Sequence, residues 1–400
     1  MLKLRLFNSK KLYPLDRVNF HNNGQNERFF TLESSEDNNI SLSISVPLQI
    51  KTKFSPSKFD CIPFNSPTFF KEQDIFQIFV NDPSVGRIGW IFPVQSLASD
   101  KHSLAENEHF LNYAYIAYSK LLHGLLLPEE QVIETASFEE DLSITDIFQS
   151  TMVIMALSDE KTQLIPNFNI DDFLPALYIQ DYFYYTGAQI LANGTRDVDD
   201  YPTVRINITP ISEFLKGEIF ISSLFKTLLT KNNHPLVQFH LLYQIVELLI
   251  NKVYDCEIRK LLTSTIDRAK SPHEILEETN QIAPEGKRIS RLIDEYIPEK
   301  KYPPNSLIDA SNDLLRLFNT QKTSIGDAFY QVRNTIVHNY RTVSKVDPNS
   351  KLLSNINIEF LRFLVDVLEN YVEPENNFEF YDMPTAWLLY MLQKEIAKPG

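Results

Sequence analysis

The residues most capable of chemistry lie together in the segment Arg333-Asn334-Thr335-Ile336-Val337-His338-Asn339-Tyr340. An imidazole titrates near neutral pH and can therefore transfer protons under ordinary conditions. A guanidinium presents its N–H donors in a planar fork that suits phosphate and carboxylate. Arg333 and His338, with the polar Asn334 beside the arginine, are thus a candidate site that combines anion binding with proton transfer.

The Arg-x4-His spacing does not by itself identify a site, because it occurs twice in this chain. Arg268 and His273 have the same spacing, but Ser271 and Pro272 lie between them. A proline inside a helix breaks it, so these two side chains are not expected to share a helical face. Arg333 and His338 are separated by no such residue, and the periodicity of 324–341 predicts one helix.

The helical periodicity of this segment predicts which side chains face the solvent. At about 100° per residue, Phe329, Val332, Ile336 and Tyr340 form one stripe, which we expect to be buried. The opposite face carries Tyr330, Gln331, Asn334, His338 and Arg341, and Arg333 lies at the boundary. Arg333 and His338 are offset by about 140° around this axis. One helix therefore does not easily direct both side chains at a single phosphate.

This segment resembles the active-site motif of HEPN-family ribonucleases. Those proteins carry an arginine, four to six further residues and a histidine, usually with a polar residue directly after the arginine. The chain also matches the longer R-x4-H-x-Y form of HepT-type toxins, in which a partner nucleotidyltransferase modifies the tyrosine, here Tyr340. The resemblance covers roughly 235–392 and implies an all-α, HEPN-like helical bundle that forms a homodimer, so that two such helices build one cleft.

The resemblance also implies a reaction, namely RNA cleavage that needs no metal and no cofactor. The ribose 2′-OH would attack the adjacent phosphorus and leave a cyclic phosphate, so DNA would not be cut. His338 would act as general acid or base, and Arg333 would bind the phosphate and stabilise the charge of the transition state. Asn334 would orient the histidine or the phosphate, and Arg341 would add positive charge.

Two further residues are candidates for supporting roles. Glu247 lies in a mostly apolar stretch, where a carboxylate should either form a salt bridge or face the site; both interpretations remain open. The family often has a base shortly after an acidic residue here, and Lys252 is the nearest one, at a somewhat different spacing. Tyr340 is interpreted first as a tyrosine beside the core and second as a modification site.

The order of elements predicts an α+β domain over 1–230 and the helical domain over 235–400. In the first, strands are predicted at 40–50, 76–80, 87–94 and 203–208, and helices at 106–127, 144–157 and 171–192. In the second, helices are predicted at 237–253, 257–269, from Ser271 onward, and at 306–318, 324–341, 358–371 and 384–397.

The N-terminal domain matches no family pattern, and by analogy we interpret it as a sensing or regulatory domain. The protein would then be a toxin or an anti-phage, abortive-infection effector that responds to a regulatory protein or a phage trigger. The alternative hypothesis is a non-catalytic HEPN interaction module that assembles a complex.

Composition restricts the remaining function classes. The net charge of −14 argues against a surface that binds long RNA through many phosphates, so an RNA site must be local. Two distant cysteines exclude a disulfide framework or a Cys-based zinc site, and no histidine has the H-E-x-x-H spacing, so no metal site is predicted. Apolar stretches of about a dozen residues are too short to span a membrane. We therefore expect a cytoplasmic protein without a membrane partner.

Overall fold

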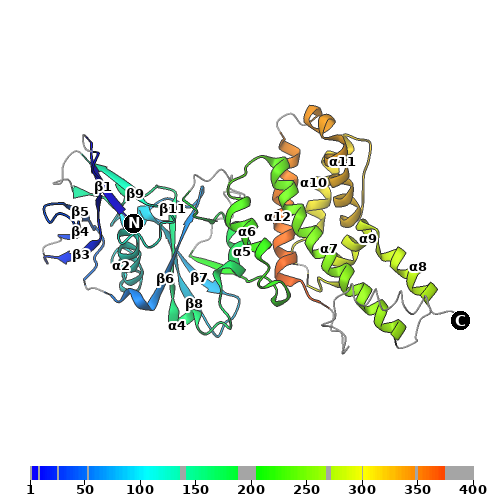
Figure 1. Cartoon of the computed structure of the whole chain (residues 1–400), viewed down its shortest axis with the longest axis horizontal. Helices are drawn as coiled ribbons and strands as arrows, with labels where there is room; N and C mark the ends of the chain where they lie inside the picture. The colour runs from blue at the N-terminus through cyan, green and yellow to red at the C-terminus, as the bar shows by residue number, and fades with distance from the viewer. Residues whose placement is uncertain are drawn as a thin grey trace. The chain divides into compact units, whose positions relative to one another are not determined.

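The computed structural model describes residues 2–7, 10–24, 27–51, 54–135, 141–187, 204–266, 272–299, 301–346 and 350–373. The chain forms two compact units (Figure 1). The N-terminal unit consists of Met1–Pro210 and Ser222–Lys231, and the C-terminal unit consists of Ile211–Ile221 and Asn232–Gly400. The first is rich in strands and the second is helical, which confirms the predicted change of character along the chain.

Strands of the N-terminal unit form three sheets within the described residues. The largest has the order β12-β6-β11-β8-β7-β13, from Phe183–Tyr184, Phe59–Asn65, Met152–Ser158, Arg87–Pro93, Phe76–Val80 and Arg205–Ile208. The second has the order β10-β5-β4-β3, from Asp141–Leu142, Ser41–Ser45, Arg28–Glu33 and Arg17–Asn22. The third has the order β2-β1-β9, from Tyr13–Pro14, Leu2–Leu6 and Gln131–Thr135. The strand predicted at 76–80 is therefore confirmed, and those predicted at 87–94 and 203–208 are confirmed over Arg87–Pro93 and Arg205–Ile208. The run 40–50 is a strand only over Ser41–Ser45.

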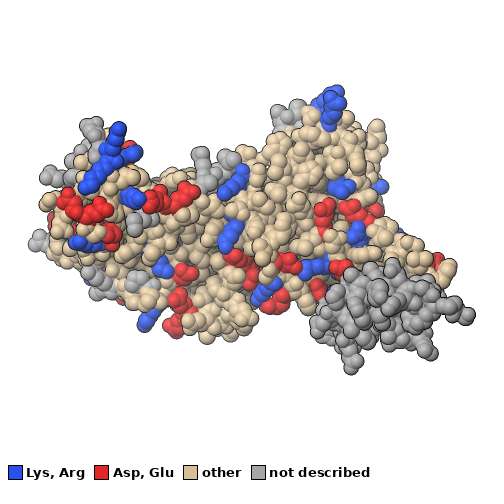
Figure 2. Space-filling view, in the orientation of Figure 1, with Lys and Arg blue, Asp and Glu red and all other residues tan. Residues whose placement is uncertain are grey.

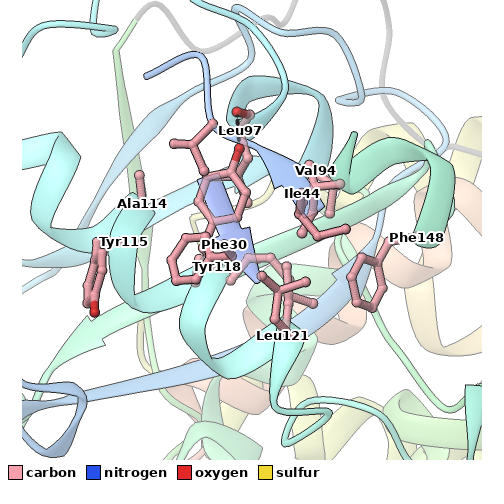
Figure 3. Close-up of a cluster of buried hydrophobic side chains, with 14 of the residues drawn as sticks. Phe30, Ile44, Val94, Leu97, Ala114, Tyr115, Tyr118, Leu121 and Phe148 are labelled. Atoms are coloured by element: carbon pink, nitrogen blue, oxygen red, sulfur yellow. Dashed lines mark hydrogen bonds between the residues drawn. The ribbon is translucent and has the colours of Figure 1, made fainter. Parts of the chain in front are cut away.

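Helix α2, Glu108–Leu122, is buried around most of its circumference. Its N-terminus is capped by Asn107, whose side chain accepts a hydrogen bond from the Phe110 amide at 3.1 Å. The Tyr118 ring stacks on Phe30 of β4 with centroids 5.4 Å apart, and its hydroxyl donates to the carbonyl of Leu97 at 2.5 Å (Figure 3). Phe110 contacts Trp90 of β8, with ring centroids 5.7 Å apart. The helix predicted at 106–127 is thus confirmed in shorter form, and it joins the two larger sheets through one core.

Two predicted helices of this unit are wrong. The segment 144–157 contains only the short helix α3, Ile144–Ile147, and then strand β11. Every residue from Met152 to Leu157 is buried, because β11 lies between β6 and β8 in the sheet interior and has no polar face. The segment 171–192 begins with the 3-10 helix η2, Ile170–Phe173, and helix α5, Leu174–Tyr178. Asp181 has a φ of 63°, which is incompatible with a continuing helix, and β12 follows. Residues 188–192 lie outside the described part.

Six longer helices make up most of the C-terminal unit. They are α7 (Pro235–Ile266), α8 (Pro272–Ile282), α9 (Glu285–Glu295), α10 (Pro304–Arg316), α11 (Ile325–Val346) and α12 (Lys351–Asn370). The chain also forms short helices at η1 (Pro56–Lys58), α1 (Val94–Leu97), α4 (Asp159–Thr162), η4 (Glu213–Leu215), α6 (Ile219–Ser223) and η5 (Leu224–Leu228). Figure 1 shows α7, α10, α11 and α12 side by side. The helices predicted at 237–253 and 257–269 are a single helix as far as Ile266, since no proline or glycine interrupts Tyr254-Asp255-Cys256.

An aromatic cluster holds α7, α11 and α12 together. Phe329 of α11 contacts Phe360 of α12 with ring centroids 4.1 Å apart, and it stacks on Tyr243 of α7 at 5.3 Å. Phe239 of α7 contacts the same Phe329 at 6.0 Å. The helix predicted at 384–397 lies outside the described residues. Among the helices that are described, none combines the length and the apolar character needed to cross a membrane.

Candidate functional site

Helix α11 presents the candidate motif as its periodicity predicts. Phe329, Val332 and Ile336 are buried, with exposed fractions of 3%, 0% and 1%. His338 and Arg341 are exposed, and Arg333 and Asn334 are half-buried. The apolar stripe therefore docks α11 into the unit and leaves the histidine on the solvent side.

The helix is kinked immediately after His338. Asn339 has a φ of −124° and a ψ of 23°, which is not a helical conformation. Arg333, Asn334 and His338 precede the kink, so their offset of about 140° follows ordinary helical geometry. Tyr340 and Arg341 follow it, and their positions are not those of a straight helix. Tyr340 is half-buried rather than part of the fully buried stripe, and Arg341 remains exposed.

The guanidinium of Arg333 is held by two neighbours. Its Nη1 donates a hydrogen bond to the Oδ1 of Asn334 at 3.1 Å. Its central carbon lies 5.9 Å from the centroid of the Tyr243 ring, which is within the range of a cation–π interaction. Asn334, expected to orient the histidine or the phosphate, thus contacts the arginine instead.

Tyr243 is itself fixed by a carboxylate from a third helix. Its hydroxyl donates to the Oε1 of Glu285, the first residue of α9, at 2.5 Å. Burial and this hydrogen bond raise the pKa of Tyr243 far above its ordinary range, and the charge of Glu247 acts in the same direction. Tyr243 therefore remains a neutral hydrogen-bond donor at any physiological pH. Neither Tyr243 nor Glu285 was predicted as a site residue, because only the packing of α7, α9 and α11 brings them to Arg333.

Glu247 lies one helical turn after Tyr243 on α7 and is half-buried. Among the contacts of the described residues, it forms no ion pair. The base considered for it, Lys252, pairs instead with Glu218, with Nζ and Oε1 2.7 Å apart. Glu247 is thus near Tyr243 on the same helix, and both interpretations of it, a salt bridge or a site role, stay open.

His338 is not joined to this group by any contact within the described residues. Its ring has no hydrogen bond or ion pair there, and it lies between exposed Val337 and exposed Asn339. The structure thus brings together Arg333, Asn334, Tyr243 and Glu285, and within its described residues His338 lies apart from them on the adjacent face of α11.

Charges at the surface are mixed rather than segregated. On the face shown in Figure 2, basic and acidic side chains of the coloured residues alternate, and no broad basic area covers them. Within the ranges that the structure describes, no three His, Cys, Asp or Glu side chains are grouped so as to hold a metal ion. Arg333, held by Asn334 and Tyr243, is the candidate cation for an anion site on α11.

Comparison with protein-family models, with curated protein sequences and with solved structures finds no match to this chain.

Proposed function

We propose that this protein is an endoribonuclease of HEPN type whose active site is built around Arg333 and His338. The observation that carries the proposal is the arrangement on α11, where a half-buried, anchored guanidinium precedes an exposed imidazole that has no partner among the described residues. The first suits a fixed phosphate ligand and the second suits a proton donor or acceptor. The helical C-terminal unit would be the HEPN-like bundle, and the N-terminal unit would regulate it.

The proposed reaction needs only groups of this kind. His338 accepts the proton of a ribose 2′-OH while the 2′-oxygen forms a bond to the adjacent phosphorus. The bond from phosphorus to the 5′-oxygen breaks, and the leaving oxygen takes up a proton from an imidazolium. The products are a 2′,3′-cyclic phosphate and a 5′-hydroxyl. Arg333 stabilises the additional negative charge on the phosphoryl oxygens in the transition state.

This proposal predicts that the purified protein cleaves single-stranded RNA in the presence of excess EDTA. The same sequence as DNA should remain intact, because it lacks the 2′-OH that attacks. Products should carry a cyclic phosphate, which mass spectrometry distinguishes from a linear 3′-phosphate by one water. Cleavage that stops on chelation and returns with a divalent ion would contradict the mechanism. Stable assembly with no RNA cleavage would favour the alternative of a non-catalytic interaction module.

The splayed positions of Arg333 and His338 lead us to propose further that the active form is a homodimer. A twofold axis beside α11 would place two arginines and two histidines around one cleft, through an interface of identical patches. Val337 lies between Arg333 and His338 around the helix axis, and 46% of its surface is exposed. It is the apolar side chain on this face that such an interface would cover.

The homodimer predicts a specific effect of Val337→Glu. Two glutamates facing each other across a twofold axis repel, so the variant should be monomeric at concentrations where the wild type is dimeric, and it should lose cleavage in parallel. Leu317→Glu is the matched control, because Leu317 is 47% exposed but lies at the end of α10. Light scattering across a dilution series measures the assembly. A wild type that is monomeric at every concentration and fully active would refute the composite site.

A further inference from the structure

Helices α7 and α9 are joined by polar contacts along their whole shared length, which we call the α7–α9 seam. At one end Tyr243 donates to Glu285, and in the middle the Nη1 of Arg288 donates to the Oδ1 of Asn251 at 3.1 Å. At the other end Glu257 accepts from the Tyr296 hydroxyl at 3.0 Å and pairs with Arg291. Each contact in this seam therefore helps to hold α7 against α9. A role in the proposed site requires a further contact, one that reaches a residue of that site.

Tyr243 supplies that further contact, because it also contacts Arg333 of the proposed site. The central carbon of the Arg333 guanidinium lies over the Tyr243 ring, 5.9 Å from the ring centroid, and the Tyr243 hydroxyl donates a hydrogen bond to Glu285. Tyr243 is 3% exposed, and its ring packs against the rings of Phe239 and Phe329 in one aromatic cluster, with centroid distances of 5.9 and 5.3 Å. It has little freedom to move, so it is a rigid support for a flexible arginine side chain.

Resting on the proposed ribonuclease function, we propose that Tyr243 and Glu285 are positioning residues that hold Arg333 in the orientation in which it binds the scissile phosphate. Neither touches the substrate in this assignment. They act through the guanidinium of Arg333. Without them this side chain would sample many rotamers, and only some of these would place it on the phosphate.

The chemistry of the pair strengthens this support. The negative charge above and below an aromatic ring attracts a cation, and a phenol that donates to a carboxylate becomes more electron-rich. Glu285 is the first residue of α9 and is linked to Arg333 through the Tyr243 ring. Within the described residues it forms no direct ion pair with Arg333 that would compete with phosphate.

The test compares kcat, KM and the thermal midpoint of five variants with those of the wild type. Tyr243→Phe keeps the ring and removes the hydroxyl, and it should lower kcat about threefold at nearly unchanged KM. Tyr243→Leu removes the ring, and the lost cation–π interaction corresponds to about tenfold in kcat. Glu285→Gln keeps a hydrogen-bond acceptor and should rescue most of the rate relative to Glu285→Ala. Asn251→Ala is the matched control, because it removes the neighbouring seam contact at a distance from Arg333.

A second experiment distinguishes a positioning role for Tyr243 from an effect on the stability of the fold. In an Arg333→Lys background the planar guanidinium is absent, so Tyr243→Phe should cause no further loss of kcat. Equal losses in both backgrounds, or an effect of Asn251→Ala as large as that of Tyr243→Phe, would show a merely structural role. An active wild type with unaffected Tyr243 and Glu285 variants would overturn the positioning assignment alone. A wild type that does not cleave RNA would overturn the proposed function and this assignment together.

Discussion

His338→Ala is expected to abolish RNA cleavage while leaving the fold unchanged. Removing a general acid or base typically costs about 10²–10⁴-fold in rate, and His338 is the proton-transfer group in the proposed reaction. The side chain is exposed and makes no hydrogen bond within the described residues. Its removal should therefore change the free energy of unfolding by no more than about 0.5 kcal/mol. Single-turnover cleavage of a labelled RNA, measured with a thermal melt of the same sample, tests both statements.

Arg333→Ala should give a comparable loss, about 10²–10³-fold, because it removes the group that stabilises the transition-state charge. It is half-buried and packs over Tyr243, so its effect on stability should be larger than that of His338→Ala but still within about 1 kcal/mol. His273→Ala is the matched control. It removes an exposed histidine on α8 that also follows an arginine by five positions. If His273→Ala reduces cleavage as much as His338→Ala does, the assignment of the site to α11 is wrong.

The sequence predicts α11 well because its buried face repeats with the helical period. Phe329, Val332 and Ile336 recur every three to four residues, and this pattern is visible without knowledge of any partner helix. The kink at Asn339 was not predictable in the same way, since no proline or glycine marks it. For the same reason, the helical pattern predicts the orientation of His338 but not that of Tyr340, which lies beyond the kink.

The support around Arg333 could not be predicted from the sequence. Tyr243 and Glu285 are separated from Arg333 by 90 and 48 positions, and each belongs to a different helix. Tyr243 fits the buried face of α7, so its periodicity indicates only a core residue. The burial of its ring and the contact with Glu285 arise from how three helices pack, which a single sequence without relatives does not encode in any local pattern.

Strand β11 was predicted wrongly as part of a helix, because its sequence has no hydrophobic periodicity. Its run Met152-Val153-Ile154-Met155-Ala156-Leu157 is apolar at every position and therefore has no period. Such a run fits a buried helix as well as an interior strand, and helix-forming residues such as Met, Ala and Leu favoured the wrong choice. Pairing with β6 and β8 on both sides decides the conformation, and both partners are distant in sequence.

The position of β11 leads to the second large effect that we expect, which concerns Gly89 in the neighbouring strand β8. Gly89 is paired with Leu157. A Cβ atom at Gly89 would lie 2.2 Å from the carbonyl oxygen of Ala156 and 3.0 Å from the Cα of Leu157. These are backbone atoms of a strand that is also bound to β6 on its other side, so they cannot move aside without breaking the sheet. Gly89→Ala should therefore destabilise the N-terminal unit by about 3 kcal/mol or more, at or beyond the usual range for overpacking.

Tryptophan fluorescence can report the stability of the N-terminal unit. The chain has two tryptophans, and in a Trp387→Phe background only Trp90 remains, which is 2% exposed and adjacent to Gly89 in β8. Urea unfolding followed by its emission should show a much lower midpoint for Gly89→Ala. Gly86→Ala is the control, because Gly86 has a φ of 73° but no atom within 4 Å of an added Cβ. Backbone strain alone should cost that variant about 1–2 kcal/mol. A midpoint for Gly89→Ala that is no lower than that of Gly86→Ala would contradict the predicted clash with β11.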